Sequence, residues 1–263
     1  MKHVLEQYKL TGKKAVVTGG LSGIGKAVSI ALAQAGADVA IADIATDSNQ
    51  AAKDAVLKEL ALYSKDSFAI KVDVSNYEEV FAVRDKIKER WGRVDILFNN
   101  AGISHTVEPE KSSKEDWAKV ININLNGAFY CAQAFGQMMI EQGSGSIIST
   151  GSISGNIINR PEEVAYSVSK AGIHQLTRGL AASWAKYGVR VNAISPGFFA
   201  TELSLPKILK YPELVKQFCT DWTPMNRIGE PEELGGIVVY LASDASSFCT
   251  GACITIDGGF TLY

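Results

Sequence analysis

The chain has 263 residues, of which 46% are hydrophobic and 21% are charged, and its formal net charge is -2. This length is enough for a large buried core. The small net charge, without a cluster of Lys or Arg, argues against a nucleic-acid surface or an anionic membrane surface. No apolar run reaches the ~18 residues of a membrane-spanning helix, and the first residues do not resemble a signal peptide. We therefore expect a cytoplasmic protein.

The cysteines form no C-x-x-C motif, and no histidine lies among them at a metal-ligand spacing. Reduced thiols are the expectation for such a set in the cytoplasm, and we predict no metal site. The cysteines are Cys131, Cys219, Cys249 and Cys253.

Short runs rich in apolar and β-branched residues alternate with segments of helical periodicity along the whole chain. Runs that are apolar on both faces, separated by helices, indicate a parallel sheet covered on both sides. We therefore predict one doubly wound α/β domain over 1–263, with a seven-stranded parallel sheet. The predicted strands are 14–19, 37–43, 67–73, 94–100, 145–151, 189–195 and 252–257.

The longest irregular segment spans 201–230 and contains Pro206, Pro212, Trp222 and Pro224. Long insertions in compact folds are most often functional loops. We therefore predict that this segment is a lid over the substrate.

The sequence TGGLSGIG at 18–25 lies between the first predicted strand and the helix after it. Gly19 permits a sharp turn, whereas Gly23 and Gly25 allow a pyrophosphate to approach the backbone at the start of the helix. Glycine-rich turns also occur without a ligand, but the strand before and the helix after favour dinucleotide binding.

Asp43 ends the second predicted strand. A carboxylate at this place can accept both hydroxyls of the adenosine ribose, and it repels a 2′-phosphate. The next residues, Ile44 and Ala45, offer no positive charge to a phosphate. The alternative is a solvated aspartate at a strand end. We predict NAD as the cofactor, in preference to NADP.

Two residues of the stretch GSISGNIINRPEEVAYSVSKAG at 151–172, Tyr166 and Lys170, are four positions apart. This spacing places both side chains on one face of a helix, one turn apart. Such a pair is common by chance, so its meaning depends on the rest of the chain.

With these motifs in this order, the chain resembles the short-chain dehydrogenase/reductase family over nearly its whole length. Besides the glycine-rich turn and YSVSK, the matching segments are NNAG at 99–102, SPGFFAT at 195–201 and TGACITIDGG near the C-terminus. The resemblance implies a Rossmann fold and an oxidoreductase. The implied cofactor contacts are Gly19, Leu21, Ser22, Gly23, Ile24, Gly25, Asp43, Asp73, Val74, Asn100, Ala101, Gly102, Tyr166, Lys170, Pro196, Gly197, Phe199 and Thr201.

The resemblance implies that Tyr166 is the acid/base that exchanges a proton with the substrate hydroxyl. A free tyrosine has a pKa near 10 and is a poor base at neutral pH. A cation ~4 Å away at an effective dielectric constant of ~20 contributes about 4 kcal/mol, or roughly three pKa units. Lys170 can supply that charge. Asn124 matches the family asparagine that holds a water in a proton relay, with Asn122 and Asn126 as rivals.

The family also uses a serine that hydrogen-bonds the substrate oxygen beside the tyrosine. Ser149, Ser152 and Ser154 all precede Tyr166. The string GSISG resembles the family's G-S-x-x-G and selects Ser152, with Ser154 as the alternative and as an expected substrate contact.

The residues around the predicted cleft are mainly polar, and they include Asn159, Glu162, Glu163 and Asn226. Such a lining suits a polyhydroxylated substrate, because a buried hydroxyl without a partner is costly. The stretch 151–172 also resembles the sugar-alcohol branch of the family, which implies a polyol/ketose couple. The expected substrate contacts are His105, Ser152, Ser154, Asn156 and Tyr166.

Two other functions remain open: a reductase of 3-oxoacyl thioesters, and a non-catalytic dinucleotide-binding protein on the same fold. The resemblance further implies a homotetramer, whose interface would include the helices over 124–140 and 166–186. We expect neither nucleic acid nor membrane as a partner.

Overall fold

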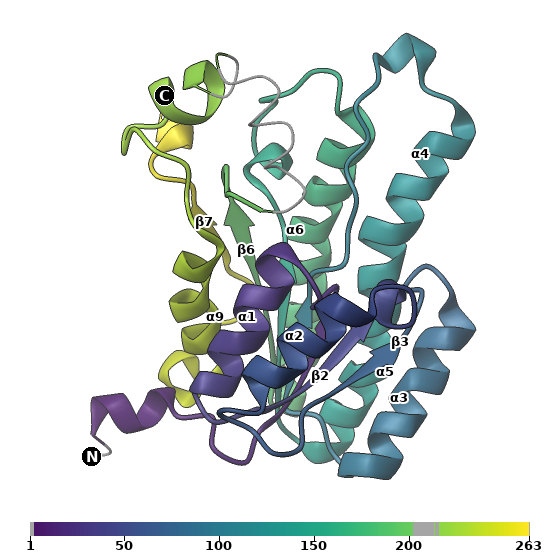
Figure 1. Ribbon diagram of the computed structural model, residues 1–263, viewed down its shortest axis with the longest axis vertical. Coiled ribbons are helices and arrows are strands. Elements are labelled where there is room, and N and C mark those ends of the chain that lie inside the picture. The colour runs from purple at the N-terminus through teal and green to yellow at the C-terminus, as the bar shows by residue number, and fades with distance from the viewer. Residues whose placement is uncertain (1–2, 202–212, 214–215, 263) are drawn as a thin grey trace.

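The computed structural model describes residues 3–201, 213 and 216–262 (Figure 1). All seven strands run parallel, in the order β3-β2-β1-β4-β5-β6-β7. The predicted doubly wound fold and its seven-stranded parallel sheet are confirmed. Six strands are shorter than predicted by one to three residues, and β6 is one residue longer. The bounds are β1 Lys14–Thr18, β2 Asp38–Asp43, β3 Phe68–Lys71, β4 Ile96–Asn99, β5 Gly145–Thr150, β6 Val189–Pro196 and β7 Cys253–Ile256.

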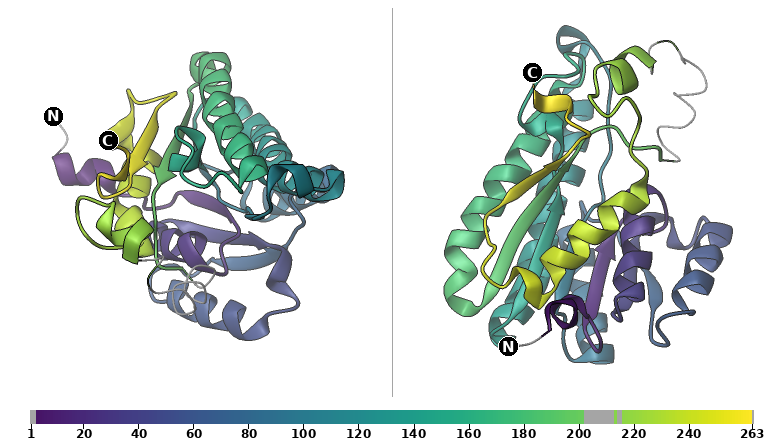
Figure 2. Two further views of the ribbon diagram at one scale, coloured as in Figure 1. Left: turned by 90° about the horizontal axis from the view of Figure 1, so that it is seen from above. Right: turned by 90° about the vertical axis from the view of Figure 1, so that its left-hand side faces the viewer.

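Helices cover both faces of the sheet, and Figure 2 shows α6 and α9 on opposite sides of it. One face packs against α1, α2 and α9, and the other against α3, α5 and α6. The bounds are α1 Gly23–Gln34, α2 Gln50–Leu60, α3 Tyr77–Trp91, α4 Lys114–Ile121, α5 Gly127–Gln142, α6 Val164–Trp184 and α9 Gly235–Ala242.

Side-chain alternation explains why the strands are apolar on both faces. In β1, Ala15 and Val17 point into the core under α1, α2 and α9, whereas Val16 points into the core under α3, α5 and α6. Successive residues of a strand face opposite sides, so a strand between two helical layers needs apolar residues at every position. This is the pattern from which the strands were predicted.

The chain order reverses between β1 and β4, which are neighbours in the sheet. Such a switch point leaves a crevice at the carboxyl ends of the two strands. Here the end of β1 holds the segment that follows β4, because the hydroxyl of Thr18 accepts hydrogen bonds from the amides of Asn100 (2.9 Å) and Ala101 (3.1 Å).

The predicted lid at 201–230 falls partly outside the described residues, which omit 202–212 and 214–215. Its final part is fastened to the end of the sheet, since the amide of Met225 donates to the carbonyl oxygen of Gly258 at 3.1 Å. Among the helices that the structure describes, none combines the length and the apolar character needed to cross a membrane.

Candidate functional site

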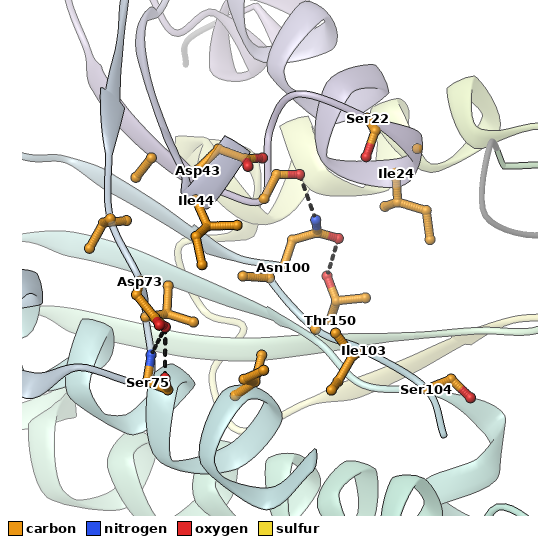
Figure 3. Close-up of a pocket in the computed structure, with 18 of the residues that line it drawn as sticks. Ser22, Ile24, Asp43, Ile44, Asp73, Ser75, Asn100, Ile103, Ser104 and Thr150 are labelled. Atoms are coloured by element: carbon orange, nitrogen blue, oxygen red, sulfur yellow. Dashed lines mark hydrogen bonds between the residues drawn. The ribbon is translucent and has the colours of Figure 1, made fainter. Parts of the chain in front are cut away.

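A cavity of about 740 Å³ opens at the carboxyl ends of the central strands. In Figure 3, Asn100 lies near its middle, with Asp43 and Asp73 to one side and Ser22 and Ile24 to the other. The cavity is lined by Gly19, Ser22, Gly23, Ile24, Ala42, Asp43, Ile44, Val72, Asp73, Val74, Ser75, Asn100, Ala101, Gly102, Ile103, Ser104, Lys119, Asn122, Ile123, Thr150, Tyr166, Lys170 and Thr201.

The glycine-rich turn has no room for side chains at its critical position. A Cβ on Gly25 would lie 2.0 Å from the carbonyl oxygen of Gly19 and 2.6 Å from Nδ2 of Asn100. Gly19 itself has a φ of +67°, which an L side chain rarely adopts. The turn therefore brings bare backbone to the start of α1, an arrangement that suits a phosphate group.

Asn100 holds this turn in place from the opposite strand end. Its Nδ2 donates to the carbonyl oxygens of Thr18 (3.3 Å) and Gly19 (3.2 Å), and its Oδ1 accepts from the hydroxyl of Thr150 (3.2 Å). One amide side chain thus connects the turn after β1 to the end of β5.

Asp43 lies at the end of β2 and lines the cavity with its carboxylate tied to backbone amides. Its Oδ1 accepts from the amide of Ala45 at 2.8 Å and its Oδ2 from the amide of Leu21 at 3.2 Å. Both hydrogen bonds leave lone pairs for ribose hydroxyls. Leu21 therefore supports the acid from outside the cavity.

The sequence did not indicate that the positively charged side chain of Lys71 lies near Asp43. Lys71 is the Cα partner of Asp43 in the β2–β3 register, and its ammonium lies 3.6 Å from the carboxylate of Asp47. Both side chains are more than half exposed. Lys71 is distant from Asp43 in the sequence and becomes its neighbour only through the register of β2 and β3. A search of the residues that follow Asp43 could therefore not find it.

Tyr166 and Lys170 both lie on α6 and line the cavity, as their spacing predicted. The Lys170 ammonium is 5.5 Å from the centroid of the Tyr166 ring and donates to the carbonyl oxygen of Thr150 at 2.7 Å. Burial lowers the pKa of Lys170 from 10.5 to about 8. Burial also raises the pKa of Tyr166 above 10, whereas a hydrogen bond with Ser152 lowers it.

The three candidate serines occupy different environments. Ser152 is buried and hydrogen-bonded with Tyr166, and its Oγ accepts from the amide of Ser154 at 3.1 Å. The hydroxyl of Ser154 donates instead to Oδ1 of Asn159 at 2.8 Å. Ser149 is buried within β5. Of the three, the structure brings Ser152 to the tyrosine.

The three candidate asparagines lie in a π-helical turn, Asn122–Asn126, that joins α4 to α5. Asn124 is buried, and its Nδ2 donates to Oγ of Ser169 on α6 at 3.1 Å. It also exchanges hydrogen bonds with the backbone of Ile103, at 2.8 and 2.9 Å. Asn126 donates to Asn122 at an exposed position. Asn124 thus connects the segment after β4 to α6, and its relay role stays a prediction.

Some predicted contacts lie outside the cavity lining. Phe199 packs into the hydrophobic core. Of the expected substrate contacts, Asn156 is exposed, and His105 is half-buried with its Nε2 3.7 Å from the Asp116 carboxylate. The remaining predicted catalytic, cofactor and substrate residues that do not line the cavity are Leu21, Gly25, Asn124, Ser152, Ser154, Pro196 and Gly197.

Several lining residues were missed because no motif contains them. Lys119 and Ile123 reach the cavity from α4 and the π-helical turn, and Thr150 reaches it from the end of β5. The other missed residues are Ala42, Ile44, Val72, Ser75, Ile103 and Ser104, while Asn122 had been considered only as a rival of Asn124.

Comparison with known proteins gives a consistent picture. The family model described as enoyl-(acyl carrier protein) reductase matches residues 19–261. A probable NADP-dependent mannitol dehydrogenase from Yarrowia lipolytica is 42% identical over 98% of this chain and 91% of its own. A galactitol 2-dehydrogenase (L-tagatose-forming) from Cereibacter sphaeroides is 40% identical over 97% of this chain and 98% of its own.

A solved structure shares the fold in detail. It is a short-chain type dehydrogenase/reductase from Mycobacterium marinum, 39% identical, with a TM-score of 0.91 over 99% of this chain and 100% of its own. The chain therefore shares its fold with this structure over almost the whole length of both.

Proposed function

Because the chain belongs to the short-chain dehydrogenase/reductase family, we propose that it is an NAD-dependent oxidoreductase that interconverts a polyol and its ketose. The observation that supports it best is that Tyr166 and Lys170 line the same cavity as Asp43 and the glycine-rich turn, while Ser152 is hydrogen-bonded with Tyr166. A protein that only bound a dinucleotide would not need a buried lysine beside a half-buried tyrosine.

When bound, the nicotinamide supplies the acceptor for the hydride that leaves the carbinol carbon. The phenolate of Tyr166 takes the hydroxyl proton of the substrate. The hydroxyl of Ser152 donates a hydrogen bond to the substrate oxygen and orients it beside the tyrosine. The Lys170 ammonium stabilises the phenolate, which burial alone disfavours. In the reverse direction, the Tyr166 hydroxyl returns the proton to the carbonyl oxygen.

The preference for NAD rests on Asp43. Its carboxylate faces the cavity at the end of β2, where it can accept ribose hydroxyls and repel a 2′-phosphate. The name of the Yarrowia relative specifies NADP, so this position has to be tested directly in this chain. Lys71, already paired with Asp47, is the cation that could compete with Asp43 for control of the preference.

The polyol assignment rests on the polar segments next to the catalytic groups and on the names of two relatives. The hydroxyl of Thr106 donates to Oε1 of Glu163 at 2.9 Å, and Arg160 donates to the same oxygen at 3.1 Å. This polar cluster joins the segment after β4 to the segment before α6. A substrate next to it has partners for several hydroxyl groups.

A second candidate is a reductase of 3-oxoacyl thioesters, which the acyl-carrier description of the family model favours. Its substrate would need an apolar channel for the acyl chain and positive charge for the carrier's phosphate. The polar cluster of Thr106, Arg160 and Glu163 fits the polyol better.

We further propose a homotetramer. Phe129 on α5 and Val168 on α6 are exposed apolar side chains on the two helices that the family resemblance assigns to an interface.

The function is tested by following NADH formation at 340 nm with a panel of C4 to C6 polyols, using NAD and NADP in parallel. Turnover of one or two polyols with NAD supports the proposal. Turnover with acetoacetyl thioester and a reduced cofactor, without any polyol activity, would support the second candidate instead.

A further inference from the structure

His174 lies one turn after Lys170 on α6 and is 3% exposed. Its ring fills the space beside Gly151 and Gly155, the two glycines that bracket the turn with Ser152. A Cβ on Gly151 would lie 2.4 Å from Nε2 of the ring, and a Cβ on Gly155 would lie 2.7 Å from its Cε1. The ring and the two glycines therefore fit each other without spare room.

The ring is also held by two hydrogen bonds. Its Nε2 lies 2.7 Å from the hydroxyl of Ser195, near the end of β6. Burial and the positive charges of Arg178 and Lys170 lower the pKa of the ring below 6.5, and a hydrogen bond with the Gly155 backbone offsets only part of this effect. The imidazole is therefore neutral at pH 7, so Nε2 accepts from Ser195 and Nδ1 donates to the Gly155 carbonyl oxygen.

The segment from Thr150 to Gly155 is thus fastened to α6 at both ends. Lys170 holds its first residue through the carbonyl oxygen of Thr150, and His174 holds its last residue. Residues four apart on a helix lie on the same face, so Lys170 and His174 present adjacent anchors to one short segment. Ser152, which reaches Tyr166, lies between these anchors.

We propose that His174 is a positioning residue for Ser152: its ring sets the distance between the 151–155 turn and α6, and so places the Ser152 hydroxyl against Tyr166. This inference rests on the proposed function, in which Ser152 orients the substrate oxygen. It assigns to His174 no contact with substrate or cofactor. The competing explanation is that the ring merely fills the core between α6 and β6.

A double-mutant cycle between His174 and Ser152 separates the two explanations. His174→Phe keeps an aromatic ring of similar size but loses both hydrogen bonds. If the ring positions Ser152, we expect kcat to fall by roughly 10²-fold, because misplacing a reacting group by about 1 Å has an effect of that size. Ser152→Ala should lower kcat comparably, and the double variant should fall no further than the lower of the two.

Thr177→Val is the matched control on the same helix. Thr177 is buried, and its hydroxyl donates to the carbonyl oxygen of Ile173 at 2.8 Å, so the substitution removes a buried hydrogen bond without touching the serine turn. We expect a lower melting temperature with kcat unchanged. The affinity for NADH, measured by fluorescence titration, should be unchanged in all four variants.

Three results would overturn the proposal. If the losses of His174→Phe and Ser152→Ala multiply in the double variant, the two residues act independently. If His174→Phe lowers only the melting temperature, as Thr177→Val should, the ring only fills the core between α6 and β6. Full turnover of Ser152→Ala would remove the catalytic role of Ser152, and this outcome alone would refute the proposed mechanism as well.

If His174→Phe does not fold, Gly151→Ala probes the same contact from the opposite side. The added methyl group must displace the ring or the turn, so we expect a loss of kcat in the wild-type background. In a His174→Ala background the ring is gone, and Gly151→Ala should then have no further effect. An equal loss in both backgrounds would show that the ring does not determine where the turn lies.

Discussion

The ammonium of Lys170 and the carbonyl oxygen of Thr150 lie 2.7 Å apart, and this hydrogen bond joins α6 to the end of β5. The hydroxyl of Thr150 continues the connection to Asn100, whose amide donates to Gly19. Three hydrogen bonds therefore connect Lys170 to the glycine-rich turn. The proposed phosphate site and the proposed catalytic residues belong to one polar network.

The burial of Lys170 predicts a stability gain when the lysine is removed. Its pKa is 10.5 in the unfolded chain and about 8 in the folded one, so the unfolded state binds more protons between these values. The destabilising effect of the charge is complete below pH 8 and disappears as the pH rises towards 10.5. The pKa shift corresponds to a destabilisation of the folded state by about 3 kcal/mol. Removing the lysine recovers less than this, because the hydrogen bond to Thr150 is lost as well.

We therefore expect Lys170→Met to be inactive but more stable than the wild type by on the order of 1–2 kcal/mol at pH 7. Denaturant unfolding at pH 7 and pH 10 measures the difference, which should shrink at the higher pH. A variant that is less stable than wild type at both values would contradict the assigned cost of burying this charge.

Tyr166→Phe is expected to bind NADH as the wild type does and to lose turnover by several orders of magnitude. The ring remains, so the cavity keeps its shape, but no group can exchange a proton with the substrate oxygen. Fluorescence titration measures binding, and NADH formation measures turnover. Tyr187→Phe, at an exposed position after α6, is the matched control and should be fully active. Retained turnover in Tyr166→Phe would remove Tyr166 from the acid/base role.

Asp43→Asn should weaken NAD binding and bring the kcat/KM ratio of NADP to NAD closer to one. The substitution removes the charge that repels a 2′-phosphate and keeps one oxygen, which can replace one of the two carboxylate oxygens that accept from Ala45 and Leu21. Asp54→Asn is the control, since Asp54 is an exposed acid on α2 that accepts a hydrogen bond from Gln50. An equal change in both variants would mean that general charge, rather than a contact at the ribose, sets the preference.

Val168→Glu is expected to dissociate the proposed tetramer, because it places a charge on the exposed apolar face of α6. Sedimentation velocity measures the state of assembly. Leu62→Glu introduces the same charge at an exposed apolar position beyond the end of α2 and should leave assembly intact. A wild-type chain that sediments as a stable and fully active monomer would exclude the tetramer.

The fold and the local motifs of the site could be predicted because each depends on residues that lie close together in the sequence. A buried parallel strand is apolar at every position, as β1 is, and the glycines of the phosphate turn must stand within a few residues of each other. Likewise, Tyr166 and Lys170 meet because they are one helical turn apart.

The contacts that depend on packing between distant segments could not be predicted. The hydrogen bond from Lys170 to Thr150 spans 20 residues, and that between His174 and Ser195 spans 21. Nothing in the sequence near His174 indicates that its ring packs against Gly151 and Gly155. The neighbour of Asp43 across the sheet, Lys71, follows from strand register, which a single sequence does not specify.

The order of the strands has a consequence for the exchange of ligands. β3 is an edge strand with one neighbour, whereas β4 and β5 are each paired on both sides. Asp73 and Val74, which line one side of the cavity, follow that edge strand directly, and Thr150 ends a central one. Edge elements open locally at lower free energy than central ones. Amide hydrogens near β3 should therefore exchange before those of β4 and β5, and the side of the cavity next to Asp73 and Val74 should open more readily than the side next to Thr150.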